Sequence, residues 1–146
     1  MITLLDVNKE IISKLKKSLS KEGHNNIKIL ESDLSEPIIR PSFKIFMEDP
    51  SYEALNSRYR ENTVTIEIYF FATDIKKYKL ENLKMQSLIE TTFIEGLRID
   101  DCFFIPINKV HSEIQDTVLV SSFDIEMVQE IEEDPGEPME DLNLNI

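Results

Sequence analysis

Apolar residues at the start of the chain recur at intervals of three and four, which is the spacing of one face of an α-helix. Thr3 and Asp6 stand in the positions of a capping box, with the carboxylate near the positive end of the helix dipole. Gly23 supplies a residue suited to ending the helix. The pattern therefore predicts an amphipathic helix over residues 3–22. Its apolar face consists of Leu4, Val7, Ile11, Leu15 and Leu19.

Most of the remaining chain alternates between apolar and polar residues, the two-residue period of a strand with one buried face. The longest predicted strand is 63–72, where Val64, Ile66, Ile68 and Phe70 face one way. Asp49-Pro50-Ser51 is expected to end the strand before it, leaving 52–62 as a polar connection. The predicted strands are 27–31, 40–47, 63–72, 97–99, 105–113 and 117–130.

A second helix is expected over residues 75–94. Asp74 is a suitable N-cap, and Tyr78, Met85, Ile89 and Phe93 lie along one stripe. The element order is α-β-β-β-α-β-β-β. It predicts an α+β fold of one domain, a mainly antiparallel sheet with both helices on one face.

Two aromatic residues interrupt the polar face of the longest predicted strand. Tyr69 and Phe71 point away from the expected core, alongside Thr63, Thr65 and Glu67. We therefore expect part of this face to be covered by a helix or by a neighbouring subunit.

Composition supports a folded protein and argues against a nucleic-acid binder. The chain has 146 residues, 41% of them hydrophobic, and a formal net charge of −12. Gripping phosphates requires clustered Lys and Arg. The charge is also uneven: residues 129–146 hold seven Asp and Glu and no Lys or Arg, which leaves 28 − 7 = 21 acids against 16 bases in residues 1–128. We expect residues 1–128 to form the domain and 129–146 to be an acidic tail or an intersubunit arm.

No constellation for catalysis, a metal or a cofactor emerges from the sequence. Cys102 is the only cysteine and is expected to be an inert packing residue, and His24 and His111 have no second ligand at metal-binding spacing. No apolar run approaches the length of about 20 residues needed to span a membrane, and no export signal opens the chain. A non-enzymatic protein made in a cytoplasm is the expectation.

Three separated stretches resemble a family of small tail terminator proteins of phages, prophages and phage-tail-like particles of low-GC Gram-positive bacteria. The first is Arg40-Pro41-Ser42-Phe43-Lys44-Ile45, similar to the family's Arg-Pro-x-aromatic strand opening. The second, the most specific, is Leu55-Asn56-Ser57-Arg58-Tyr59-Arg60 leading into the strand 64–71. The third is the ending, where 118–127 runs into an acidic segment and spaced leucines. Where the family has Tyr-Phe-Pro, this chain reads Tyr69-Phe70-Phe71-Ala72.

The resemblance implies a structural protein of a virion or phage-tail-like particle, assembled in the cytoplasm of a bacterial host. Such a protein forms a ring, usually a hexamer, on the head-proximal end of the tail tube and stops tube polymerisation. Its implied partners are further copies of itself, the tail tube protein, the head-tail connector or neck protein, and the sheath protein of a contractile tail. A head-to-tail ring needs heterologous contacts that close on themselves.

Two groups of residues are candidates for these contacts. Arg58, Tyr59 and Arg60 belong to residue types enriched at interface hot spots, and Tyr69 and Phe71 are exposed by the strand pattern. The alternative is that Tyr59 packs at the rim of the sheet while the arginines pair with nearby glutamates. The candidate C-terminal arm carries Met139, Leu142, Leu144 and Ile146 among its acids.

Two other functions stay open at the level of the sequence. A neck or stopper protein of the head-tail joint would bind the connector instead of the tube. An acidic intracellular adaptor would bind a basic partner through residues 129–146 and would lose that binding when they are deleted.

Overall fold

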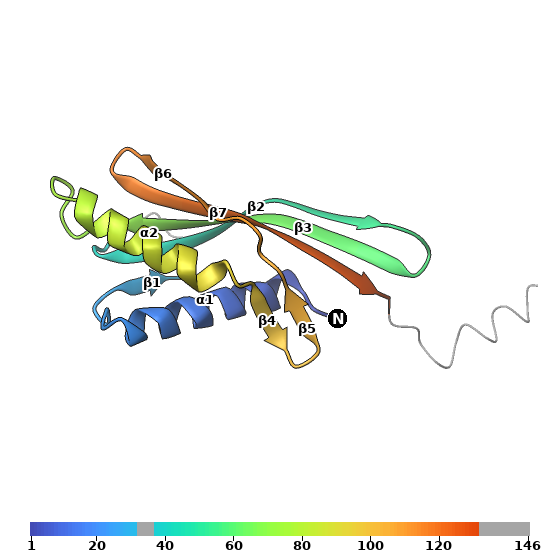
Figure 1. The fold of residues 1–146 in the computed structure, drawn as a ribbon. Helices are drawn as coiled ribbons and strands as arrows, with labels where there is room; N and C mark the ends of the chain where they lie inside the picture. The colour runs from blue at the N-terminus through green and yellow to red at the C-terminus, as the bar shows by residue number, and fades with distance from the viewer. Residues whose placement is uncertain (32–36, 132–146) are drawn as a thin grey trace, which may run out of the picture.

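The protein folds as a five-stranded sheet with two helices on one face and a small separate hairpin (Figure 1). The computed structural model describes residues 1–31 and 37–131. The α+β class and the placement of both helices on one face are confirmed. The helices are α1 (Leu4–Lys21) and α2 (Lys79–Phe93). The strands are β1 (Lys28–Leu30), β2 (Ser42–Ala54), β3 (Tyr59–Phe71), β4 (Leu97–Asp100), β5 (Phe103–Ile105), β6 (His111–Gln115) and β7 (Val118–Glu130).

The order of strands in the main sheet is β1-β2-β3-β7-β6. β1 pairs with β2 in parallel, and the other pairs are antiparallel. β3 lies at the centre and pairs along nearly its whole length with both β2 and β7. It therefore fixes the register of the sheet.

The core lies between the sheet and the two helices. The inward residues of β3 predicted from the sequence, Val64, Ile66, Ile68 and Phe70, are all buried. They meet the buried stripe of α1 and that of α2, where the Phe93 ring stacks on Phe123 of β7 with 5.1 Å between centroids. Burying each large apolar side chain contributes about 1.5–3 kcal/mol, so this layer supplies most of the stability. The helical members of the core are Val7, Ile11, Leu15, Leu19, Met85, Leu88, Ile89 and Phe93.

The capping box of α1 is present as predicted. The Asp6 backbone N–H donates to the Thr3 hydroxyl oxygen at 3.3 Å, and the Asp6 carboxylate accepts from the Thr3 backbone N–H at 2.8 Å. The Thr3 hydroxyl also donates to this carboxylate at 3.0 Å. These bonds favour the ionised form, and the backbone bond from Thr3 is the largest cause that lowers the pKa of Asp6 from 3.8.

This lowered pKa sets the pH at which the cap stabilises the fold. A carboxyl group with a depressed pKa in the folded state contributes its stability above 3.8 and loses it as the pH falls through the lower, folded value. We therefore expect Asp6→Asn to be less stable than wild type at neutral pH, and the gap to narrow at pH values below 3.8. Urea unfolding of both proteins across this range measures the gap, and a gap independent of pH would contradict the prediction.

The largest error of the sequence prediction concerns residues 52–62. They were expected to be a polar connection, but β2 continues to Ala54 and β3 begins at Tyr59. Asp49-Pro50 does not end β2, because the ladder resumes at Ser51 after a register shift, with Asp49 in the left-handed region at φ 50°. The result is a long hairpin that extends past the end of the helical layer (Figure 1).

Two other boundaries differ from the prediction. The helix expected over 75–94 begins at Lys79, because Asp74 caps a turn through bonds from the Lys76 and Lys77 N–H groups. The strand expected over 105–113 is divided into β5 and β6. Pro106 has no N–H to donate to a ladder, which agrees with β5 ending just before it. β5 pairs with β4 in its own hairpin.

The expectation that Cys102 is packed in the interior is wrong. The residue is exposed in the turn between β4 and β5, where its N–H donates to Asp100 Oδ1 at 2.8 Å. Asp101 and Cys102 form the two-residue turn, and the apolar residues that follow belong to a short strand in which only Ile105 is buried.

Gly96, at the end of α2, holds a conformation that a side chain would disrupt. Its φ is +99°, and an added Cβ would lie 2.5 Å from the Ile105 carbonyl oxygen. Gly23 has a φ of +79° with nothing within 4 Å of an added Cβ. We expect Gly96→Ala to cost about 2–5 kcal/mol and Gly23→Ala about 1–2 kcal/mol, because only the first adds a clash to the backbone strain. Chemical denaturation compares the two, and equal losses would mean that the close approach of β5 to Gly96 does not matter.

Candidate interaction surfaces

The residues singled out as contacts lie at opposite ends of β3. Arg58, Tyr59 and Arg60 form the tip of the β2–β3 hairpin, and Tyr69 and Phe71 lie near the far end of the strand. Tyr59 and Tyr69 are 69 − 59 = 10 positions apart, or about 33 Å at 3.3 Å per residue. One copy of the protein therefore presents two separate surfaces.

Asn56 organises the tip of the hairpin. Its Oδ1 accepts hydrogen bonds from the backbone N–H groups of Arg58 and Tyr59 at 2.8 and 3.0 Å. Its carbonyl oxygen accepts from Arg60 Nη1 at 2.8 Å, and the Leu55 N–H donates to the Tyr59 carbonyl at 3.0 Å. An asparagine side chain that bonds the backbone two and three residues ahead fixes a tight turn, so the tip is held in one shape.

Asn56→Ala is expected to loosen this turn without unfolding the protein. Two hydrogen bonds to the side chain are lost, at about 0.5–1.5 kcal/mol each. Amide hydrogen exchange at Arg58 and Tyr59 should accelerate by at least about tenfold while the global unfolding transition stays nearly unchanged. Asn25→Ala, at an exposed turn after α1, is the control and should leave these two amides unchanged.

The tip presents apolar side chains to solvent. Tyr52 is 61% exposed, Leu55 48% and Tyr59 38%. Arg58 pairs with Glu130 of β7, and the Ile131 N–H donates to the Arg58 carbonyl at 2.7 Å. The end of β7 thereby braces the hairpin. Large aromatic residues held in a rigid, exposed turn are typical of contact surfaces.

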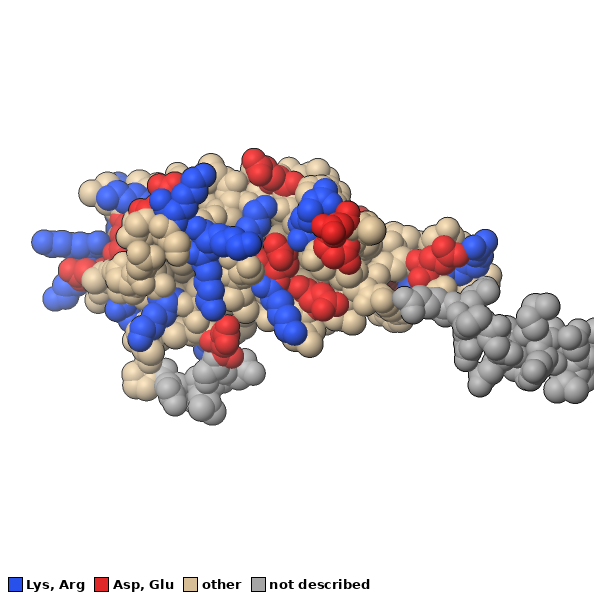
Figure 2. Space-filling view, turned by 90° about the horizontal axis from the view of Figure 1, so that it is seen from below, with Lys and Arg blue, Asp and Glu red and all other residues tan. Residues whose placement is uncertain are grey.

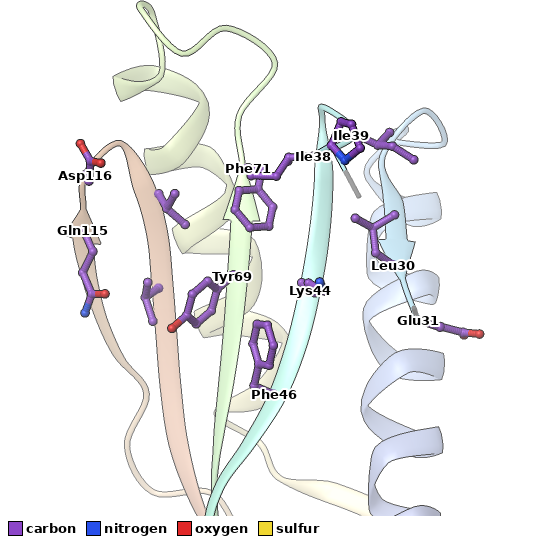
Figure 3. Close-up of a pocket in the computed structure, with 13 residues that line it drawn as sticks. Leu30, Glu31, Ile38, Ile39, Lys44, Phe46, Tyr69, Phe71, Gln115 and Asp116 are labelled. Atoms are coloured by element: carbon purple, nitrogen blue, oxygen red, sulfur yellow. The ribbon is translucent and has the colours of Figure 1, made fainter. Parts of the chain in front are cut away.

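The second surface is a groove on the face of the sheet opposite the helices. It encloses about 590 Å³ and is lined mostly by apolar side chains from β1, β2, β3 and the β6–β7 turn (Figure 3). The Phe46 and Tyr69 rings meet edge to face at 4.9 Å, and Phe71 lies 6.4 Å from Tyr69. The predicted cover over Tyr69 and Phe71 does not come from a helix of this chain. Phe71 is nevertheless only 8% exposed, with the Arg40 guanidinium 5.8 Å from its ring, whereas Tyr69 is half-buried.

Partial burial is the main cause that raises the pKa of Tyr69, and Glu67 adds to it through its charge and a 3.2 Å hydrogen bond from the tyrosine hydroxyl. With its pKa raised above 10.0, Tyr69 stays neutral at physiological pH. The groove floor is accordingly aromatic and uncharged, except where Lys44 lies 5.7 Å from the Phe46 ring.

Several groove residues were not identified from the sequence. Of these residues, only Phe46 could have been recognised in the sequence, because the alternation places it on the opposite face of its strand from Phe43 and Ile45. Three further groove residues could not be recognised, because their position beside β2 follows from tertiary structure. They are Leu30, Ile38 and Ile39. The candidate arm residues Met139, Leu142, Leu144 and Ile146 lie outside the described residues.

Comparison with protein families decides the identity. The family model described as phage tail terminator protein matches residues 6–137, nearly the whole chain. The chain belongs to the phage tail terminator protein family. This confirms the resemblance and makes the protein a structural component of a phage tail. No curated protein matches the sequence.

The helical face of this tail terminator family member differs in charge from the rest of the molecule. α1 carries five lysines against Asp6 and Glu10, although the whole chain has a net charge of −12. Figure 2 shows lysine and arginine side chains gathered over this face. A groove of about 840 Å³ lies between the helices, with Lys14, Lys21 and Lys84 in its lining. The helical face is thus more basic than the chain as a whole.

The described residues contain no group of three or more His, Cys, Asp or Glu side chains placed to hold a metal ion. Within the same residues, neither helix is long and apolar enough to cross a membrane.

Proposed function

We propose that the protein assembles as a ring, with six copies as the expected number, on the head-proximal end of the tail tube. There it stops tube polymerisation and offers the face to which the head-side connector or neck protein attaches. In a contractile tail the sheath protein is a further partner. The observation that carries the proposal is the match of the tail terminator family over residues 6–137.

The two exposed surfaces support a ring on physical grounds. A head-to-tail ring requires two different patches on each copy, placed so that successive contacts close. The hairpin tip and the groove are two such patches, at opposite ends of β3. Both are rich in the aromatic residues that dominate binding energy at interfaces.

Assembly of the purified tail tube protein in the presence and absence of this protein tests the proposal. Short tubes with a ring at one end, seen by electron microscopy, are the expected result. Long, uncapped tubes at every ratio of the two proteins would refute it. If the protein then bound purified connector and not tube, it would be a neck protein.

A further inference from the structure

We propose that residues 132–146 dock in the groove between α1 and α2 of the same copy. Leu142, Leu144 and Ile146 contact the exposed leucines of α2, and the acids before them face the lysines of the groove. This interhelical groove encloses about 840 Å³. The proposal assigns a partner to the helical face, which the proposed ring does not use, and it does not depend on that ring.

Two leucines of α2 stand exposed in the lining of the interhelical groove. Leu80 is 74% exposed and Leu83 is 51% exposed. Residues three apart on a helix are neighbours, so the two side chains form one apolar patch. Covering this patch removes apolar surface from water, which stabilises the contact with a segment that carries apolar side chains of its own.

The interhelical groove is basic on balance. Over α1 and α2 together, seven lysines stand against four acidic residues. Lys14 Nζ donates to the Gly96 carbonyl oxygen at 2.7 Å, and this neutral acceptor leaves the charge of the lysine unbalanced. No carboxylate of the described residues lies within ion-pair distance of a lysine in the lining. The charged residues of the lining are Lys14, Lys21 and Lys84 with Glu22 and Glu95, and His24 lies among them.

The balance of charge is reversed in the sheet groove, where three acids stand against two bases. These residues line the groove or contact its aromatic rings, and they are Glu31, Glu67, Asp116, Lys44 and Arg40. Residues 132–146 contain six Asp and Glu and no Lys or Arg. Because opposite charges attract, this acidic segment favours the interhelical groove over the sheet groove.

The segment begins beside the N-terminal end of α1. The Gln129 side chain exchanges hydrogen bonds with the Ile2 backbone at 2.7 and 2.8 Å. Lys14, in the groove lining, lies 14 − 2 = 12 residues farther along α1, or about 18 Å at 1.5 Å per residue. The lysines of α1 are therefore the part of the groove that the segment meets first.

The exposed leucines lie in the more distant part of the groove. The two helices run in opposite directions, and Thr92 Oγ1 donates to Ser18 Oγ at 2.8 Å (Figure 1). Ser18 is 16 residues after Ile2, and Leu83 is nine residues before Thr92. Along the helices, Leu83 is therefore about 38 Å from Ile2 at 1.5 Å per residue.

The segment is long enough to cover the groove of its own copy. Residues 142–146 stand 13 to 17 positions after Gln129 and extend at most about 43 to 56 Å from it, at 3.3 Å per residue. A tethered segment of this kind meets its own groove at an effective concentration in the millimolar range. At micromolar protein concentration, the groove of another copy competes poorly. Length and tether therefore select the segment of the same chain as the occupant.

The order of residues in the segment matches the order of features in the groove. All six acids lie in 132–141, and 142–146 alternate between apolar residues and asparagine without a charge. The acids thus reach the lysines of α1, and the apolar end reaches the leucines of α2.

Disulfide formation in the full-length chain tests the contact. In a Cys102→Ser background, Leu144→Cys is combined with Leu83→Cys in the interhelical groove or with Ile38→Cys in the sheet groove, at groove positions 51% and 50% exposed. In a glutathione redox buffer at micromolar protein, we expect the Leu83 pair to close within one chain, with an effective concentration in the millimolar range. The Ile38 pair should stay mostly open. A disulfide-linked dimer as the main product of the Leu83 pair, or equal closure of both pairs, would overturn the inference.

Charge reversal in this double-cysteine chain tests the role of the lysines. Lys21→Glu with Lys84→Glu should lower the effective concentration of the Leu83 pair by about tenfold. Lys44→Glu with Lys109→Glu makes the same change in net charge away from the interhelical groove and is the matched control. An equal decrease in the two double variants would show that the lysines of the groove do not bind the segment.

Lysine acetylation followed by mass spectrometry gives a readout that needs no cysteine. In the chain with Leu142→Ser, Leu144→Ser and Ile146→Ser, we expect Lys21 and Lys84 to be acetylated severalfold faster than in the wild type, because the segment no longer covers them. Lys109 is exposed outside the groove and should react at the same rate in both chains. Unchanged rates at Lys21 and Lys84 would contradict docking in the interhelical groove.

Discussion

Phe70→Ala is expected to lower the free energy of unfolding by about 3–5 kcal/mol, which is a large part of the roughly 5–15 kcal/mol that stabilises a domain of this kind. Phe70 is completely buried near the C-terminal end of β3, between Phe43 of β2 and Leu119 of β7. Its ring lies 4.9 Å from that of Phe43. Alanine removes this contact and leaves a cavity that the paired strands cannot close.

Phe104→Ala is the matched control for this effect. The Phe104 side chain is 45% exposed on β5, and its ring lies 5.2 Å from the Arg98 guanidinium carbon and next to Gly96. We expect a loss of about 1 kcal/mol or less, since little buried apolar surface disappears. Urea denaturation gives both values. Equal losses for the two variants would show that the space between sheet and helices is not the main source of stability.

The burial of Phe70 belongs to the part of the fold that the sequence could predict. The inward face of β3 was predictable, because burial on one side imposes a period of two on Val64, Ile66, Ile68 and Phe70. The stripe of α1 and its capping box were predictable for the same reason, since each depends on residues close together in the chain. These elements carry most of the core.

The hairpin beyond Asp49 was not predictable from alternation. Residues 48–59 are exposed on both faces, so burial places no periodic constraint on their side chains. Their strand structure is maintained by backbone pairing with β3, which leaves no mark on side-chain type. The polar composition that suggested a connection in fact belongs to an exposed arm.

The candidate site was predictable in its parts but not in its arrangement. Residue type pointed to Arg58–Arg60, and the alternation of the strand pointed to Tyr69 with Phe71. Their separation depends on β3 being one unbroken strand of 13 residues. The walls of the groove, at Ile38 and Asp116, depend on how β1 and the β6–β7 turn are placed against the sheet, which is a property of tertiary structure.

A pair of truncations has the second large expected effect. A chain ending after Val128 should be less stable than one ending after Ile131 by about 2–4 kcal/mol. The three residues between these end points hold the arm and the N-terminus together. Gln129 exchanges two side-chain hydrogen bonds with the Ile2 backbone, at 2.7 and 2.8 Å, Glu130 pairs with Arg58, and Ile131 donates to the Arg58 carbonyl.

Thermal and urea unfolding of the two truncated chains measure this difference, and equal stability would mean that the end of β7 does not brace the arm.

The same chains also separate the tail terminator from an adaptor that acts through its acidic end. The chain ending after Ile131 keeps both the hairpin tip and the groove, so it should still shorten tubes in the assembly assay. An adaptor would lose its binding with either truncation. Capping by the chain that ends after Ile131, and weaker capping by the one that ends after Val128, would place the function in the folded domain and in the braced arm.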